Sequence, residues 1–207
     1  MDTVPHSGLN DNPHMILVPL TLKDKNLYVS ISFADAELSD RIWRAQSNGT
    51  SFYAVRTERY PAGGPKKQRV VFMHRVILER KLGRAIHHGM VADHINGNTL
   101  DNRRENLREA TLRQNQHNKR GQSQASHGYK GVICLQNSPS RKQDTLKKPW
   151  VARIWGEGKR HEYGGFATVE EAARAYDRAA IRFNGEFVRL NFPKEDYAEL
   201  HEGGGWE

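Results

Sequence analysis

A carboxylate and an imidazole stand side by side in the stretch MVADHINGNTLDNRRENLREATLRQNQHN, where Asp93 and His94 end a short apolar run. Asn106 follows after an Asn-Gly pair, and Asn115 comes later in the same stretch. Hydrolysis of a phosphodiester needs a base that deprotonates water and a cation that absorbs charge on the phosphate and the leaving oxygen. Histidine, with a pKa of about 6.5, suits the first task, and carboxylate and amide oxygens suit a hard cation such as Mg²⁺. These residue types therefore indicate metal-assisted hydrolysis.

The residues around this constellation predict two strands and a helix that would hold it. An apolar pair at residues 91–92 predicts a strand that carries the acid and the histidine to its end. Asn-Gly at residues 96–97 is a favoured tight turn, because both residues tolerate positive φ. Residues 106–110 predict the returning strand. Thr111 followed three residues later by Gln114 matches a capping box, so a helix should begin directly after Thr111.

The order of a strand histidine, a middle asparagine and a helix asparagine resembles the HNH nucleases, and the DHINGN run resembles their phage- and intron-borne homing endonucleases. This resemblance implies that His94 is the general base. It also implies that Asp93 and Asn115 hold one divalent ion, most naturally Mg²⁺. Asn106 matches the middle asparagine, which ties down the loop that carries the histidine. Periodicity alone does not choose between Asn115 and His117, so His117 stays as the alternative ligand.

The composition favours several small modules over one large core. The chain has 207 residues, of which 37% are hydrophobic, and its mean hydropathy is −0.79. No apolar run approaches the length of a membrane span, and the first residues lack a signal-peptide pattern. We therefore expect a cytoplasmic protein with no membrane partner. Cys134 is the sole cysteine, which excludes an internal disulfide and a cysteine-rich structural zinc site.

The balance of charge suggests a polyanionic partner. The formal net charge is +8, and the sequence pI is near 9.7. Neutralisation of phosphates supplies most non-specific affinity for DNA. The end of the chain from residue 194 is acidic, so the positive charge belongs to the middle of the sequence. Charge alone does not separate a DNA-binding protein from an RNA-binding one.

The front of the chain predicts a small region of strands and helices before the HNH stretch. Its apolar patterns predict strands at 15–18, 27–31, 51–59 and 68–73, and helices at 36–44 and 74–82. Gly83 should end the second of these helices as its C-cap. His74 is expected to pack or hydrogen-bond at the start of that helix rather than to bind a metal ion.

A second unit of strands and one helix follows a stretch rich in Gly, Gln and Ser at residues 119–127, which is typical of a linker. Residues 129–135, 150–155 and 159–163 predict three strands. Thr168 with Glu171 is a second capping box, and the helix that it opens is rich in alanine. One face of this helix collects Ala172, Tyr176, Ala179, Ala180 and Phe183.

The phrases YKGV, WVARI, GGF, EEAARAYDRAA and LNFP resemble the APETALA2-type DNA-binding domain over residues 129–193. This resemblance implies that the sheet enters the major groove of double-stranded DNA while the helix braces its back. Alternation along the strand puts Ala152 and Ile154 toward the helix, so Arg153 and Trp155 should face DNA.

Two positions limit what this resemblance implies about bases. Ile133 and Glu162 stand where the plant factors place an arginine and a tryptophan, so the base preferences of those factors do not transfer. The basic loop before the second strand should contact phosphates. The expected DNA-binding residues are Lys130, Arg141, Lys142, Lys147, Lys148, Arg153, Trp155 and Arg160.

Together these patterns predict an α+β protein built from small parts. The sheet of the second unit should be three-stranded, antiparallel and packed on one helix. The expected division is a disordered N-terminus at 1–14, a sheet and helix region at 15–83, a ββα-metal HNH unit at 84–118, a linker at 119–127, an APETALA2-like domain at 128–193 and an acidic tail at 194–207.

The combined prediction is a site-specific, metal-dependent DNA endonuclease of the homing type that needs no small-molecule cofactor. One metal site naturally serves one strand, so we expect a monomer that nicks DNA. The alternative is a sequence-specific DNA-binding protein whose nuclease module is inactive. An RNA-binding protein defined by charge alone would explain neither of the two resemblances.

Overall fold

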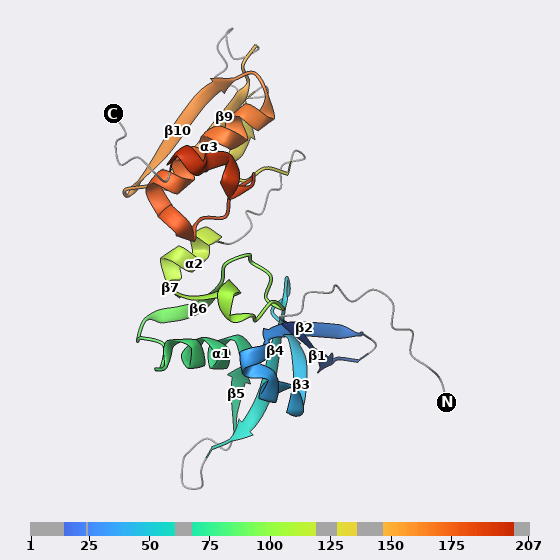
Figure 1. The fold of residues 1–207 in the computed structure, drawn as a ribbon. Helices are drawn as coiled ribbons and strands as arrows, with labels where there is room; N and C mark the ends of the chain where they lie inside the picture. Colours follow the sequence, from blue (N-terminus) through green and yellow to red (C-terminus); the bar gives the residue numbers. More distant parts are fainter. Residues whose placement is uncertain (1–14, 24, 61–67, 119–127, 136–146, 201–207) are drawn as a thin grey trace. The chain divides into compact units, whose positions relative to one another are not determined.

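The computed structural model describes residues 15–23, 25–60, 68–118, 128–135 and 147–200 of the chain. The chain divides into two compact units, Met1–Ala110 and Thr111–Glu207. Both combine helices with antiparallel strands (Figure 1), so the prediction of an α+β fold is confirmed. No helix in the described ranges has the length and apolar composition needed to cross a membrane.

A five-stranded sheet, called the front sheet below, makes up the N-terminal part of the first unit and has the strand order β2-β1-β3-β4-β5. A helix and a two-stranded sheet, β6-β7, follow it (Figure 1). The elements of this unit are β1 (Met15–Thr21), β2 (Leu27–Ser32), the 3₁₀ helix η1 (Phe33–Asp40), β3 (Trp43–Ser47), β4 (Phe52–Arg59), β5 (Gln68–Phe72), α1 (Met73–Leu82), β6 (Met90–His94), η2 (Arg104–Asn106) and β7 (Leu107–Thr111).

One expected helix of the first unit is wrong. The pattern at residues 36–44 predicts a helix, but η1 ends at Asp40 and β3 begins at Trp43. Trp43 and Ala45 are buried while Arg44 between them is exposed, which is the period of a strand rather than of a helix. So short a segment is compatible with either a helix or a strand. Pairing of β3 with β1 and β4 stabilises the strand.

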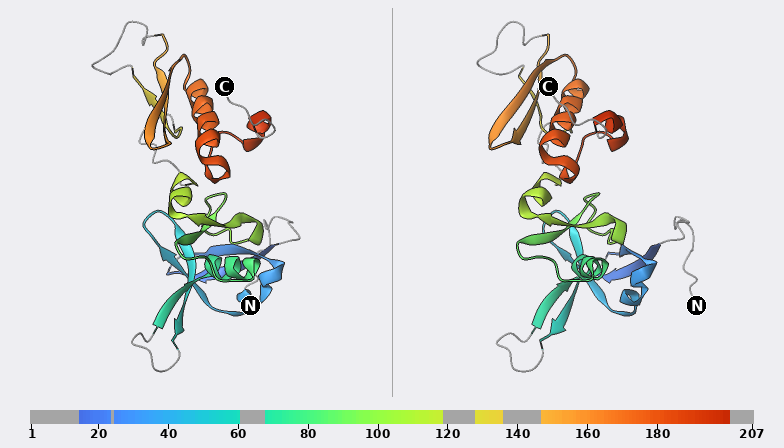
Figure 2. Two further views of the ribbon diagram at one scale, coloured as in Figure 1. Left: turned by 90° about the vertical axis from the view of Figure 1, so that its left-hand side faces the viewer. Right: turned by 60° about the vertical axis from the view of Figure 1, so that its left-hand side comes forward.

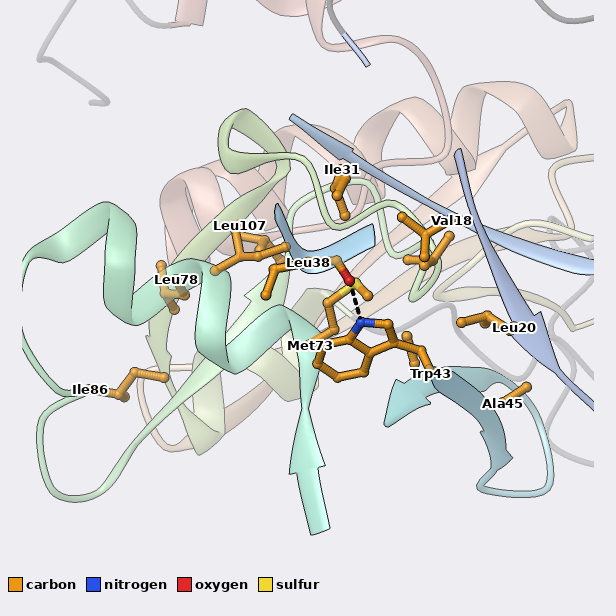
Figure 3. Close-up of a cluster of buried hydrophobic side chains, with 13 residues drawn as sticks. Val18, Leu20, Ile31, Leu38, Trp43, Ala45, Met73, Leu78, Ile86 and Leu107 are labelled. Atoms are coloured by element: carbon orange, nitrogen blue, oxygen red, sulfur yellow. Dashed lines mark hydrogen bonds between the residues drawn. The ribbon is translucent and has the colours of Figure 1, made fainter. Parts of the chain in front are cut away.

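The core of the first unit gathers around Trp43, whose side chain is fully buried (Figure 3). Its indole Nε1–H donates to the carbonyl oxygen of Leu38 over 2.8 Å, which satisfies the buried polar atom. Met73 and Leu78 from α1 and Leu107 from the start of β7 belong to the same cluster. The core therefore joins the front sheet to the strand pair that holds the candidate site.

The second unit packs a three-stranded antiparallel sheet, of order β10-β9-β8, against helix α3 (Figure 2). This confirms the predicted sheet and its helix. Its elements are α2 (Leu112–Asn118), β8 (Val132–Cys134), β9 (Trp150–Gly156), β10 (Lys159–Phe166), α3 (Val169–Asn184), η4 (Gly185–Phe187) and η5 (Lys194–Leu200).

Small residues allow α3 to lie close to the sheet. The predicted capping box is present at its start, since Glu171 N–H donates to Thr168 Oγ1 over 3.2 Å and the Glu171 carboxylate accepts from Thr168 N–H over 3.3 Å. Ala172 and Ala180 are completely buried against the strands. A Cβ atom at Gly156 would lie 2.5 Å from the Phe183 ring, so the sheet requires glycine at that position.

A buried carboxylate ties the end of the second unit to α3. Asp177 accepts hydrogen bonds from the backbone N–H groups of Asn191 and Phe192 over 2.9 and 3.0 Å. It also accepts one from the Tyr197 hydroxyl over 2.9 Å. Burial raises the pKa of Asp177, and these hydrogen bonds oppose that shift. The carboxylate thus holds the LNFP segment in place.

We expect Asp177→Ala to lower the free energy of unfolding of the second unit by about 2–3 kcal/mol, because several donors lose a charged acceptor at once. Hydrogen exchange read by mass spectrometry on the full chain checks this, with faster exchange in residues 169–197 and unchanged exchange in the first unit. Equal acceleration in both units would contradict the local role of Asp177.

Candidate active site

Strand β6 delivers a carboxylate and an imidazole to one end of the two-stranded sheet. Asp93 and His94 are its last residues, and both side chains are buried, with 3% and 5% of their surface exposed. The chain turns directly after them, because Gly97 N–H donates to the His94 carbonyl oxygen over 2.8 Å. Gly97 has a φ of +68°, as the predicted Asn-Gly turn requires.

The loop after His94 is held closed by amide side chains. Asn106 Oδ1 accepts from the Asn96 backbone N–H over 2.9 Å. Asn106 Nδ2 donates to Asn96 Oδ1 over 3.0 Å and to the Asp101 carbonyl oxygen over 2.7 Å. Asn106 therefore bridges both arms of the loop that follows the histidine. Its expected supporting role in catalysis stays a prediction that this geometry favours.

His94 is oriented by a second buried amide, that of Asn102, which has no exposed surface. His94 Nε2 lies 2.8 Å from Asn102 Oδ1. Because an amide oxygen only accepts hydrogen bonds, Nε2 carries the ring proton in the neutral histidine and Nδ1 carries the lone pair. Burial lowers the pKa of His94, while the Asn102 hydrogen bond and the charges of Asp93 and Asp101 oppose the shift. The imidazole is thus kept in its basic form at neutral pH.

Asp93 is paired with a cation of the neighbouring strand. Arg108 Nε donates to Asp93 Oδ2 over 2.9 Å, and both side chains are largely buried. An ionised carboxylate is a hard oxygen ligand, so Asp93 fits one position of an Mg²⁺ site. No three His, Cys, Asp or Glu side chains gather around a common point in the described part of the chain.

The structure brings Asp93, His94 and Asn106 together in the first unit. The two candidates for the second metal ligand, Asn115 and His117, lie on α2, which belongs to the second unit. The capping box predicted for α2 is present, since Gln114 N–H donates to Thr111 Oγ1 over 3.2 Å and the reciprocal bond is 2.8 Å. The choice between Asn115 and His117 stays a prediction.

Sequence reasoning missed several neighbours of His94. The His74 ring centroid is 5.0 Å from that of His94, and the Tyr53 centroid is 6.4 Å away. Burial is the main cause that lowers the pKa of His74 to about 3, so this second imidazole stays neutral. Asn102 stands in an Asn-rich loop, where sequence alone does not separate a buried amide from a turn-forming one. The sequence singles out His74 as a packing residue, but only tertiary contacts place it, Tyr53 and Asn102 beside His94.

The outer face of the second unit's sheet carries several of the expected DNA-binding residues. Trp155 is 59% exposed and pairs across the strands with the exposed Arg160. Arg153 Nε donates to Glu162 Oε2 over 2.6 Å, so an acidic partner already holds this guanidinium. Ala152 and Ile154 face α3, as alternation predicts.

The expected basic contacts outside that face divide into three groups. Lys130 Nζ donates to the His117 carbonyl oxygen over 2.7 Å, and burial is the main cause that lowers its pKa to about 8. Lys147 and Lys148 are exposed just before β9. Arg141 and Lys142 lie outside the described residues. The contacts of all these side chains with DNA stay predictions.

Comparison with known proteins identifies the segment that holds the candidate site. Residues 71–117 match the HNH endonuclease family model. The HNH segment thus covers α1, both strands of the two-stranded sheet and α2 up to His117. The resemblance seen in the sequence is confirmed there.

Relatives of two kinds match the chain over part of its length. The uncharacterized HNH endonuclease L560 of Acanthamoeba polyphaga mimivirus is 32% identical over 120 residues, which are 58% of this chain and 54% of that protein. APETALA2-like protein 2 of Oryza sativa is 38% identical over 81 residues, which are 39% of this chain and 17% of that protein. Dehydration-responsive element-binding protein 2A of Arabidopsis thaliana is 47% identical over 53 residues, which are 25% of this chain and 16% of that protein. No solved structure matches.

The Asn102 hydrogen bond makes a prediction about the His94 ring. In the wild type, ¹H–¹⁵N correlation spectra of the imidazole should show the form protonated at Nε2. In Asn102→Ala, we expect that preference to fall or reverse, because the acceptor that selects the tautomer is gone. His88→Ala is the control, since His88 is exposed. An unchanged His94 tautomer in Asn102→Ala would show that other contacts select it.

Proposed function

We propose that this chain is a metal-dependent, site-specific DNA endonuclease of the homing type. The observation that carries the proposal is the arrangement at the end of β6, where a buried carboxylate lies beside an imidazole held by a buried amide. This pair falls within the segment that matches the HNH endonuclease family. Such a pair is suited to hydrolysis of a phosphodiester bond.

In this mechanism His94 is the general base. The Asn102 acceptor keeps the proton on Nε2, so Nδ1 is the atom that takes a proton from the attacking water. Burial favours the neutral ring, which is the form that a base requires. Asn106 keeps the turn after the histidine closed and so fixes the direction of the ring.

Asp93 and Asn115 are the residues that we propose to hold one divalent ion, with His117 as the alternative to Asn115. Bound there, Mg²⁺ would stabilise negative charge on the phosphate and the leaving oxygen. The Arg108 guanidinium orients the Asp93 carboxylate through their ion pair. No sulfur ligand set for a structural zinc is available, since Cys134 is the sole cysteine of the chain.

We propose that the second unit binds double-stranded DNA. We assign to it the similarity with an APETALA2-like protein and with a protein named for binding a dehydration-responsive element, which are 38% identical over 81 residues and 47% identical over 53 residues of the chain. The exposed Trp155 and Arg160 on the outer face of β9 and β10 support this role.

One metal site per monomer acts on one strand, so we propose that the protein is a monomer that nicks DNA. We also propose that it acts in the cytoplasm and that a phage or another mobile element carries its gene.

A DNA-binding protein with an inactive nuclease module is the second candidate. The ion pair between Arg108 and Asp93 favours it, since it engages the carboxylate that a metal ion would need. A sequence-specific gel shift without cleavage under any divalent ion would support this candidate.

The catalytic proposal predicts the effect of His94→Ala. Removal of the base should slow cleavage by roughly 10²–10⁴-fold and leave the affinity for DNA within about twofold. Single-turnover cleavage of mapped target DNA and a gel shift on the same preparation measure both quantities. His88→Ala should behave as the wild type. Full activity of His94→Ala would remove His94 as the general base.

The metal proposal predicts that EDTA stops cleavage and that added Mg²⁺ restores it. In Asp93→Ala, we expect the Mg²⁺ concentration for half-maximal rate to rise at least about tenfold, because a carboxylate ligand is lost. Cleavage that persists in EDTA after dialysis would overturn the role of the metal ion.

The DNA-binding proposal predicts a specific change with salt. Arg160→Ala should weaken binding and lower the slope of log affinity against log salt concentration by about one, as for a lost phosphate contact. Arg178→Ala is the matched control, because Arg178 is an exposed arginine on α3, the helix that covers the other face of the sheet. Equal effects of both variants would contradict a DNA-facing sheet.

A further inference from the structure

A pocket of about 360 Å³ opens in the first unit beside the candidate active site. Side chains from five elements line it, among them Gln46 of β3, Tyr53 of β4 and Phe72 of β5. His74 of α1 and Ala92 of β6 contribute to the same wall. Sites that enclose a small molecule typically have volumes of about 300–1,000 Å³. The pocket is thus large enough to enclose one unit of a polymeric substrate.

Three aromatic rings line the pocket, and each keeps some surface exposed. The Tyr53 and Phe72 ring centroids lie 6.1 Å apart, nearly at right angles. The His74 centroid lies 5.5 Å from each of them. Burial keeps the His74 ring neutral, so it adds an aromatic surface without charge. A wall of this kind suits a flat, aromatic ligand.

The pocket also offers polar groups at defined places. Gln46 lies directly opposite Tyr53 in the pairing of β3 with β4, so both side chains share one face of the sheet. Among the described residues, the Gln46 amide has no hydrogen-bond partner, which leaves one donor group and one acceptor for a ligand. Arg75 stands exposed at the edge of the pocket, with its Nε bonded to Glu79 over 3.1 Å.

The pocket borders the candidate base, although His94 itself does not line it. Val91 and Ala92 line it, and the next two residues of β6 are Asp93 and His94. The His74 ring, which forms part of its wall, is 5.0 Å from the His94 ring. A ligand in this pocket would therefore lie next to a phosphate that contacts His94.

We propose that this pocket binds one nucleobase of the cut strand, lifted out of the duplex next to the scissile phosphate. The aromatic wall stacks on the base, the Gln46 amide bonds its edge and Arg75 meets the backbone beside it. This inference rests on the proposed endonuclease function and adds a base-reading site to it. A base inside the pocket would also exclude water on one side of His94 and fix the register of the strand.

Extraction of a base costs the free energy of its pairing and stacking, and that cost falls when its partner is mismatched. The test uses the full chain carrying His94→Ala in EDTA, with a duplex selected from a random library by binding. A single mismatch is placed at each position in turn by a change in one strand only. We expect the affinity for DNA to rise about tenfold when the mismatch is at the position next to the mapped cut. A mismatch at any other position should leave the affinity unchanged or lower it.

Two variants connect that signal to the pocket. Gln46→Ala and Phe72→Leu, each added to the His94→Ala chain, should weaken binding to the mismatched duplex about tenfold and so abolish its advantage. Gln68→Ala and Val70→Ala on β5 are matched controls, because both residues are exposed and lie outside the lining of the pocket. If Phe72→Leu lowers stability, Gln46→Ala alone still decides the test.

A flat profile over all positions, or an advantage that survives in Gln46→Ala, would overturn the pocket as a base-binding site. Failure of the proposed function would look different. In that case the chain with His94 intact would bind the selected duplex and leave it uncut in Mg²⁺, whatever the mismatch profile.

Discussion

The hydrogen bond between His94 and the Asn102 amide is the interaction on which the candidate site depends. It selects the protonated nitrogen of the ring and fixes the direction in which the other nitrogen points. A buried amide serves this purpose only if its loop does not move. The Asn106 bridge to Asn96 and to the Asp101 carbonyl supplies that rigidity.

The same loop is fastened to the front sheet of the first unit. Arg104 donates two hydrogen bonds to the buried Asp35 carboxylate, over 2.7 and 2.9 Å. Ser30 N–H donates to the Leu100 carbonyl oxygen over 2.9 Å, and Leu107 packs in the core around Trp43. Buried polar groups stabilise a fold only when their partners are present. The front sheet therefore acts as the support that makes a loop of amides and charges stable.

Local patterns were enough to predict much of this architecture. The capping boxes at Thr111 and Thr168, the glycine after α1 and the Asn-Gly turn each depend on a few neighbouring residues, and the structure has all of them. The helix expected at residues 36–44 failed because β3 is decided by pairing with β1 and β4, which lie outside the segment.

The sequence singles out Asp93, His94 and Asn106 of the candidate site, but not the buried partners of His94. Asp93 and His94 stand together in the chain, but Asn102 gains its role through complete burial, and His74 through a ring contact across 20 residues of sequence. The pocket beside them combines strands and a helix that no local pattern connects. Composition and periodicity carry no information about such contacts, because tertiary packing creates them.

The central claim is that Asp93 and His94 serve one scissile phosphate together with a metal ion. A crystal structure of the His94→Ala chain with its target DNA and Mn²⁺ tests this most directly, because anomalous scattering locates the ion. The account predicts one ion that contacts the Asp93 carboxylate and a phosphate oxygen, with that phosphate facing residue 94. An Asp93 that stays paired with Arg108, with no ion beside it and no phosphate near residue 94, would contradict the account.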